Sequence, residues 1–248
     1  MTVMEKVDIL GVPVDRSDME GAMARVTALL DTDGTSTVYT PNSEMVVNAA
    51  KDKEFLEILK SGDLVVPDGI GLILASRIYG SPLPERVTGF DLMTRMLEML
   101  DEGGRSVCLL GGKPGIAQRA AGNISRMFPS LQIKGTFHGY FKEQEVPGIV
   151  ERINSSGADV LFVALGSPKQ EKWISSNRET LNVSIAMGVG GSLDVLAGEV
   201  ARAPAVFRKA GLEWFYRLVT QPWRAARMLS LPVFVFKVFI DRGRRGKV

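Results

Sequence analysis

The chain has 248 residues, 45% of them hydrophobic, which is enough apolar material for one large α/β domain with a sizeable core. Its single cysteine, Cys108, excludes an internal disulfide and a cysteine-rich zinc site, and favours a reducing compartment. The net charge of +2 hides an asymmetry, because residues 202–248 carry eleven basic and only two acidic side chains. The first fifteen residues hold scattered charges and no long apolar run, so we expect no signal peptide.

Apolar runs that are typical of buried strands alternate along the chain with helical patterns. The strand-like runs lie at 36–39, 64–66, 106–110, 131–136, 159–165 and 183–189. Apolar residues three and four positions apart predict helices near 17–30, 43–59, 70–79, 90–101, 115–128, 145–155 and 169–179. This alternation predicts an α/β fold with a Rossmann-like, mostly parallel sheet and helices on both of its faces.

Polar or glycine-containing segments follow five of the predicted strands. In chain order they are residues 40–42 (TPN), 67–69 (PDG), 111–115 (GGKPG), 166–170 (GSPKQ) and 188–192 (GVGGS). The carboxyl ends of parallel strands meet at one edge of a sheet, where α/β proteins bind ligands, so we expect these segments to surround one site. Glycine allows backbone N–H groups to approach a phosphate closely, although a plain turn is the alternative at each position. The GxxxxGK[ST] and GxGxxG nucleotide motifs are both absent.

Two of these segments hold candidate reactive side chains. Asp68 follows a buried run and precedes a helix, where partial desolvation suits a general base, and an N-cap is the alternative. Thr40 is suited either to line the site or to cap the next helix, with Pro41 in its first turn. No pair of carboxylates has the spacing of a metal site, so we expect no bound metal. The lone His138 is predicted to be a surface or core residue rather than a base.

The last fifth of the chain differs in composition from the rest, since it holds eight of the eighteen aromatic residues as well as the excess of basic ones. We therefore predict a core domain over residues 1–201 and a basic, aromatic, helical appendage over residues 202–248. The apolar run at 229–240 is too short to cross a bilayer, which needs about twenty residues. We expect this run to lie on an anionic membrane surface, and a buried core helix is the alternative.

Motifs in a fixed order over nearly the whole chain resemble one known family. They are ILGVPVD (9–15), TPNSEMVVNA (40–49), DLVVPDGIG (63–71), PLPERVTGFDL (82–92), LGSPKQEKWI (165–174), GVGGSLDVLAG (188–198), and RAP, GLEWFYRL and QPWRAAR between 202 and 227. With these motifs the chain is similar to the WecG/TagA/CpsF family of bacterial glycosyltransferases, glycosyltransferase family 26.

The resemblance implies an inverting glycosyltransferase that needs neither a metal ion nor a cofactor. It implies a UDP-sugar donor carrying N-acetylmannosamine or its uronic acid, and a lipid-linked acceptor, N-acetylglucosamine on undecaprenyl diphosphate. The product would enter teichoic acid or another cell-surface polymer, and the enzyme would work in the cytoplasm, peripherally on the inner face of the membrane. UDP-glucose or another UDP-hexose, used in exopolysaccharide synthesis, is an alternative donor.

A nucleotide-dependent oxidoreductase is a less favoured function, because the GxGxxG dinucleotide-binding motif is missing. No nucleic-acid partner is expected, because residues 1–201 are acidic overall. Assembly into a homo-oligomer stays open.

The resemblance also assigns roles to residues. It matches Asp68 to the proposed base of the family, and it matches Thr40, Asn42, Gln170 and Arg86 to other site positions. Without a metal, arginine side chains are well suited to stabilise the leaving diphosphate, although a solvated basic surface is the alternative for those near the carboxyl terminus. The candidate substrate-binding residues are Gly111, Gly112, Gly166, Lys169, Gly190, Arg217, Arg224 and Arg227.

Overall fold

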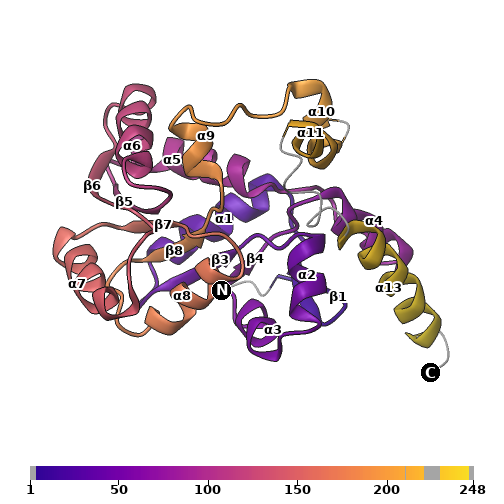
Figure 1. Ribbon diagram of the computed structural model, residues 1–248. Coiled ribbons are helices and arrows are strands. Elements are labelled where there is room, and N and C mark those ends of the chain that lie inside the picture. The colour runs from indigo at the N-terminus through magenta and orange to yellow at the C-terminus, as the bar shows by residue number, and fades with distance from the viewer. Residues whose placement is uncertain (1–3, 210, 221–229, 246–248) are drawn as a thin grey trace.

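A six-stranded parallel sheet forms the centre of the computed structural model, which describes residues 4–209, 211–220 and 230–245 (Figure 1). The strand order is β4-β3-β8-β7-β5-β6, and every neighbouring pair is parallel. All residues of β3, β5, β7 and β8 are buried, which explains the largely apolar sequences of β5, β7 and β8. The predicted parallel α/β sheet is confirmed. The strands are β3 (Ser36–Tyr39), β4 (Leu64–Val65), β5 (Ser106–Gly111), β6 (Gln132–Phe137), β7 (Val160–Ala164) and β8 (Ile185–Gly188).

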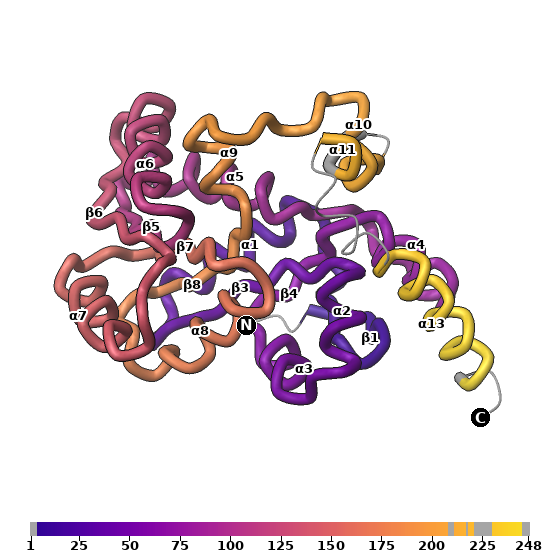
Figure 2. Tube along the Cα trace, in the orientation of Figure 1, coloured from indigo at the N-terminus to yellow at the C-terminus, as the bar shows by residue number. Residues whose placement is uncertain are grey.

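Helices cover both faces of this sheet, as predicted (Figures 1 and 2). Successive strand residues alternate between two hydrophobic clusters, so that Val38 belongs to one cluster and Tyr39 to the other. One face carries α1 (Met19–Leu30), α5 (Gly89–Glu102), α6 (Ile116–Met127) and α9 (Ser192–Leu196). The helices on the other face contribute residues to the second cluster, and they are α2 (Ser43–Ala49), α3 (Lys53–Lys60), α4 (Ile70–Ile78), α7 (Val146–Ser156) and α8 (Lys169–Asn177). A 3-10 turn, Glu143–Glu145, precedes α7.

An antiparallel hairpin that was not predicted precedes the sheet. Strands β1 (Lys6–Ile9) and β2 (Val12–Asp15) are joined by a two-residue turn in which Leu10 and Gly11 have φ values of 53° and 90°. Positive φ at both central residues is the geometry that matches the twist of a tight hairpin. The buried Asp15 ties the hairpin to the sheet, because its Oδ2 accepts the N–H of Val65 at 2.7 Å.

The single helix expected near 43–59 is two helices, α2 and α3. The chain turns after Ala49, and Asp52 starts α3 by accepting the N–H of Phe55 at 3.1 Å. The N-cap of α2 is Asn42, whose Oδ1 accepts the N–H of Met45 at 3.1 Å. The capping role considered for Thr40 is therefore wrong, because the backbone stays extended as far as Asn42.

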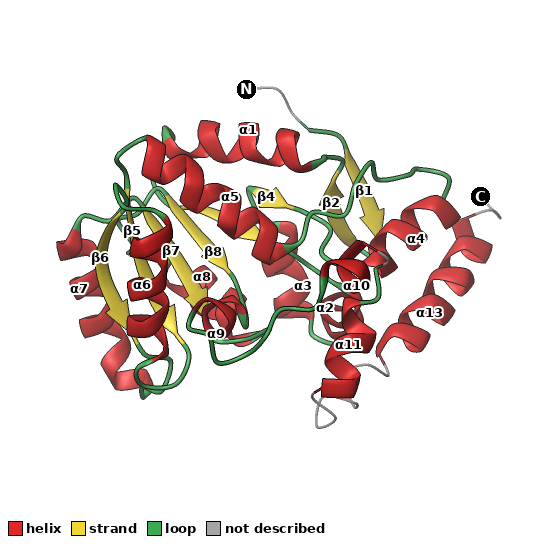
Figure 3. Cartoon of the chain, turned by 90° about the horizontal axis from the view of Figure 1, so that it is seen from above, coloured by secondary structure: helices red, strands yellow, loops and turns green. Residues whose placement is uncertain are grey.

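Among the residues that the structure describes after Arg202 are the helices α10 (Ala205–Lys209), α11 (Glu213–Thr220) and α13 (Ser230–Arg245). Helix α13 lies beside α2 and α4 (Figure 3). Its residues Phe234 and Val238 are buried in the hydrophobic core, whereas Phe236 and Phe239 are 67% and 55% exposed. The helix thus has both a core-packed face and an exposed apolar face, and the domain division at 201/202 stays a prediction. None of the helices in the described ranges combines the length and apolar character that a membrane span requires.

Candidate active site

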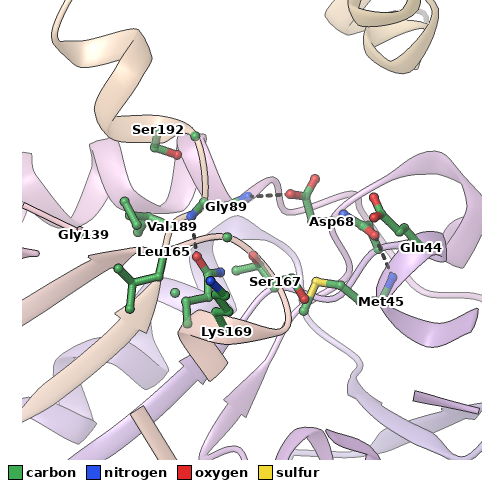
Figure 4. Close-up of a pocket in the computed structure, with 18 of the residues that line it drawn as sticks. Glu44, Met45, Asp68, Gly89, Gly139, Leu165, Ser167, Lys169, Val189 and Ser192 are labelled. Carbon is green, nitrogen blue, oxygen red and sulfur yellow. Dashed lines mark hydrogen bonds between the residues drawn. The ribbon is translucent and has the colours of Figure 1, made fainter. Parts of the chain in front are cut away.

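One large pocket lies at the carboxyl ends of the parallel strands and encloses about 1790 Å³. All five of the polar segments predicted from the sequence contribute residues to its lining, which confirms that they share one edge of the sheet. The space is large enough for a nucleotide-linked ligand together with a second substrate, since single drug-sized ligands occupy roughly 300–1,000 Å³. Figure 4 shows part of this pocket, with Asp68 and Lys169 on separate sides of it.

Asp68 lies where the segment after β4 meets the first turn of α5. Its Oδ2 accepts the N–H of Gly89 at 3.3 Å (Figure 4). It does not cap α4, because the N-cap of that helix is Gly69 and no side chain bonds there. The N-terminus of a helix carries partial positive charge, so the start of α5 is a suitable place for a carboxylate side chain. The alternative capping role of Asp68 is therefore excluded.

Thr40 and Asn42 also line the pocket, and they flank Pro41, whose carbonyl oxygen accepts the N–H of Asp68 at 2.9 Å. A Cβ atom placed on Gly89 would come within 2.8 Å of Thr40 Oγ1 and 3.6 Å of Asp68 Oδ2. Glycine at position 89 therefore lets the start of α5 approach both side chains. Asn42 has two structural roles, because it caps α2 and also lines the pocket.

Arg86 lines the pocket from the loop between α4 and α5, and it meets a residue of the carboxyl-terminal region. Its Nη1 lies 3.7 Å from Oε2 of Glu213, and the two side chains are 19% and 15% exposed. Trp214, the next residue of α11, lines the pocket as well. A second link is made by Arg202, which pairs with Asp91 of α5. The region after residue 201 thus borders the pocket, and no pattern in the sequence predicts that Glu213 is the partner of Arg86.

The predicted glycines fall into two groups. Gly112, Gly166 and Gly190 line the pocket together with Lys169, and their φ values of 69°, 76° and 52° are ones that glycine adopts readily. Gly111 is instead the last residue of β5 and is not part of the lining. A Cβ atom there would clash with the backbone of Ala164, so this glycine allows close packing of neighbouring strands.

Gln170 lines the pocket and is only 5% exposed. Its Oε1 accepts the N–H of Gly190 at 2.9 Å, and its Nε2 donates to Oε1 of Glu171 at 2.7 Å. Burial raises the pKa of Glu171 above its usual value. Glu171 was not singled out from the sequence, because a glutamate in the first turn of a helix is ordinarily a surface residue.

The three predicted tail arginines are described only in part. Arg217 belongs to α11, whereas Arg224 and Arg227 lie outside the described residues.

In the described ranges, no group of three or more His, Cys, Asp or Glu side chains is arranged to hold a metal ion. His138 is exposed and does not line the pocket, as expected for a surface residue.

Comparison with known proteins decides the family. The model of the Glycosyl transferase WecG/TagA/CpsF family matches residues 7–248. The chain belongs to this family. The resemblance seen in its ordered motifs is therefore confirmed, and the protein is a glycosyltransferase whose pocket lies where α/β folds bind their ligands.

Three curated relatives share one name, N-acetylglucosaminyldiphosphoundecaprenol N-acetyl-beta-D-mannosaminyltransferase. The relative from Bacillus spizizenii is 37% identical over 212 residues, which is 86% of this chain and 82% of the relative. The one from Bacillus subtilis is 35% identical over 201 residues, covering 81% and 78% of the two chains. The one from Staphylococcus aureus is 34% identical over 245 residues, or 96% of both chains.

Proposed function

We propose that this protein transfers N-acetylmannosamine, or its uronic acid, from a UDP-sugar to N-acetylglucosamine on undecaprenyl diphosphate. The proposal is supported by the names of the relatives, which specify this acceptor and an N-acetyl-beta-D-mannosaminyl product. The observation that carries it in the structure is the juxtaposition in one pocket of Asp68 with the glycine-rich ends of β5, β7 and β8. This arrangement supplies a base next to surfaces that suit a phosphate.

The reaction needs one proton transfer and one displacement. In the proposed mechanism the Asp68 carboxylate takes the proton of the acceptor hydroxyl, and the hydroxyl oxygen bonds to the anomeric carbon of the sugar. The bond between that carbon and the β-phosphate oxygen breaks, and UDP leaves with the electron pair. Attack from the side opposite UDP inverts the anomeric centre. Asp68 is the only one of the predicted catalytic residues whose side chain is a carboxylate, so it is the assigned base.

The leaving diphosphate gains negative charge, which the site has to stabilise. Arg86 is the described arginine best placed to do this, because it lines the pocket with its guanidinium largely shielded from solvent. Backbone N–H groups near Gly112, Gly166 and Gly190 are suited to contribute as well. We retain Arg217, Arg224 and Arg227 as proposed contributors from the carboxyl-terminal region, on the basis of the family resemblance.

A donor comparison tests the proposed substrate. The enzyme is given a lipid-diphosphate N-acetylglucosamine acceptor and, separately, UDP-N-acetylmannosamine, its uronic acid, UDP-N-acetylglucosamine and UDP-glucose. We expect acceptor-dependent UDP release to be highest with one of the two mannosamine donors. Preference for UDP-glucose would favour the alternative role in exopolysaccharide synthesis. Absence of release with every donor would contradict the proposed function.

We also propose that the enzyme works peripherally on the inner face of the membrane, docked through α13. The exposed apolar face of this helix, formed by Val233, Phe236, Phe239 and Ile240, is followed by the exposed Arg242 and Arg244. Apolar side chains next to basic ones are typical of a helix that lies in the headgroup region of an anionic membrane. Docking of this kind would bring the enzyme to the lipid-linked acceptor that the names of the relatives specify.

Replacement of both Phe236 and Phe239 by serine is expected to abolish flotation with anionic liposomes. Activity on a short, water-soluble acceptor should be retained, because these side chains point into solvent and the buried Phe234 and Val238 still hold the helix. The matched control is Met127→Ser, which removes an equally exposed apolar residue, 52% exposed, from α6. Undiminished flotation of the double variant would show that α13 is not the docking surface.

A further inference from the structure

The Gln170 amide joins a buried carboxyl group to a loop of the pocket. Its Nε2 donates to Glu171 Oε1 at 2.7 Å, and its Oε1 accepts the Gly190 N–H at 2.9 Å. A Cβ atom placed on Gly188 would lie 2.6 Å from Gln170 Nε2, so the loop that follows β8 rests directly on this amide. Figure 4 shows Val189 and Ser192, which belong to the same segment as Gly190, at the edge of the cavity.

Glu171 is an unusual residue for the interior. It is 1% exposed, and in the described part of the chain its Oε2 makes no hydrogen bond of ordinary length, although the nearby Ser167 hydroxyl acts to lower the pKa that burial raises. Its titratable neighbour is Tyr39 of β3, which is also buried and whose pKa is raised to about 12, chiefly by burial. A buried carboxyl group with an unsatisfied oxygen costs stability, and an apolar side chain of similar size would pack there at less cost. Its presence therefore calls for a reason other than stability.

The chemistry of the two side chains supplies that reason. A side-chain amide can be turned by half a rotation, which exchanges its donor and its acceptor. An acceptor oxygen on Glu171 fixes the orientation, because the NH₂ group of Gln170 has to face it. The carbonyl oxygen is then directed at Gly190, whose backbone N–H is a donor. In the opposite orientation, two donors would face each other at Gly190, and two acceptors would face each other at Glu171.

From these contacts we propose that Glu171 is a positioning residue of the donor site. It sets the orientation of the Gln170 amide, and this amide holds residues 188–191 in the shape that receives the nucleotide diphosphate of the donor. Glu171 itself does not line the pocket, so it acts through Gln170. This inference rests on the proposed function, which supplies the identity of the ligand.

The test measures binding of UDP by isothermal titration calorimetry with the full-length protein. Glu171→Leu removes the acceptor oxygen at similar volume, and we expect it to weaken UDP binding by about tenfold or more, the value of one lost orienting hydrogen bond and the loop order that depends on it. Glu171→Gln keeps an acceptor oxygen and should stay within about threefold of the wild type. The melting temperature of Glu171→Leu should change little, because the removed cost of burying a carboxyl group offsets the acceptor that the buried Gln170 NH₂ group loses.

Two further variants separate positioning from a general structural role. Gln170→Leu and the double variant Gln170→Leu/Glu171→Leu should show the same loss of UDP affinity, because Glu171 has no route to the loop once Gln170 is gone. Asp159→Leu is the matched control. Asp159 bonds Ser106 and Arg105 at the amino ends of β5 and β7, so its loss should lower the melting temperature and leave UDP binding unchanged.

Kinetics give a second readout. Glu171→Leu should raise KM for the UDP-sugar and leave kcat at saturating donor near the wild-type value. If the wild type binds UDP and Glu171→Leu binds it equally well, the inference is wrong even though the proposed function stands. If the wild type itself does not bind UDP, the proposed function is wrong, and the inference is overturned with it. Should Glu171→Leu not fold, normal UDP affinity in Gln170→Leu would overturn the inference on its own.

Discussion

Asp68→Asn is expected to lower turnover by about 10²–10⁴-fold, the usual contribution of a general base. The asparagine keeps an oxygen that can accept the N–H of Gly89, so the junction with α5 should be preserved. What it loses is the ability to take a proton from the acceptor hydroxyl. Turnover is measured as acceptor-dependent UDP release, and UDP affinity and melting temperature should both stay close to those of the wild type.

Asp63→Asn is the control for this variant. Asp63 also bonds a backbone N–H, that of Thr37 at 2.7 Å, but it lies at the amino end of β4 and does not line the pocket. We expect it to lose stability and retain turnover. If Asp68→Asn turns over at a rate close to that of the wild type, Asp68 has no part in proton transfer, and another group must act as the base.

Arg86→Ala should lower turnover by about 10²–10³-fold, the range found when one group that stabilises developing negative charge is removed. Its guanidinium is shielded from solvent and lines the pocket, where electrostatic interactions are stronger than in water. Arg86→Lys should recover only part of the activity, since an ammonium group keeps the charge and loses the two-pronged bond to phosphate. These rates are measured at saturating donor.

Arg95→Ala provides the comparison for Arg86. Arg95 lies on α5 and pairs with Glu20 at the surface, so its removal should change turnover little. Glu213→Gln adds a second check, because it removes the charge that faces Arg86 and keeps the shape of the side chain. Full activity of Arg86→Ala would shift the stabilisation of the diphosphate to the backbone N–H groups and to the arginines of the carboxyl-terminal region.

The sheet and the position of the site could be predicted because their causes are local. The strands at 106–110 and 159–165 are buried on both sides, so each reads as an uninterrupted apolar run. Because parallel strands have their carboxyl ends at the same edge of the sheet, the segments that follow them meet at that edge. The break at Asp52 was missed because apolar spacing alone continues through 43–59, although Asp52 is a good N-cap.

Contacts between distant parts of the chain could not be predicted. Nothing near Gly89 in the sequence shows that it would meet Thr40 and Asp68, and nothing near Glu213 indicates Arg86. The burial of Glu171 could not be predicted either, because it depends on the packing of α8 against β3 and β8, which are distant in the sequence or follow it. Composition alone marked residues 202–248 as an appendage, whereas the packing of Phe234 shows that α13 also contributes to the core.

The central claim is that Asp68 acts as the base of an inverting transfer that needs no metal ion. The most direct measurement is the anomeric configuration of the product, determined by NMR after reaction of an α-linked UDP-sugar with a soluble acceptor in excess EDTA. We predict a β-linked product, formed at a rate that added Mg²⁺ or Mn²⁺ hardly changes. An α-linked product, or transfer that appears only when a divalent ion is restored, would contradict the claim.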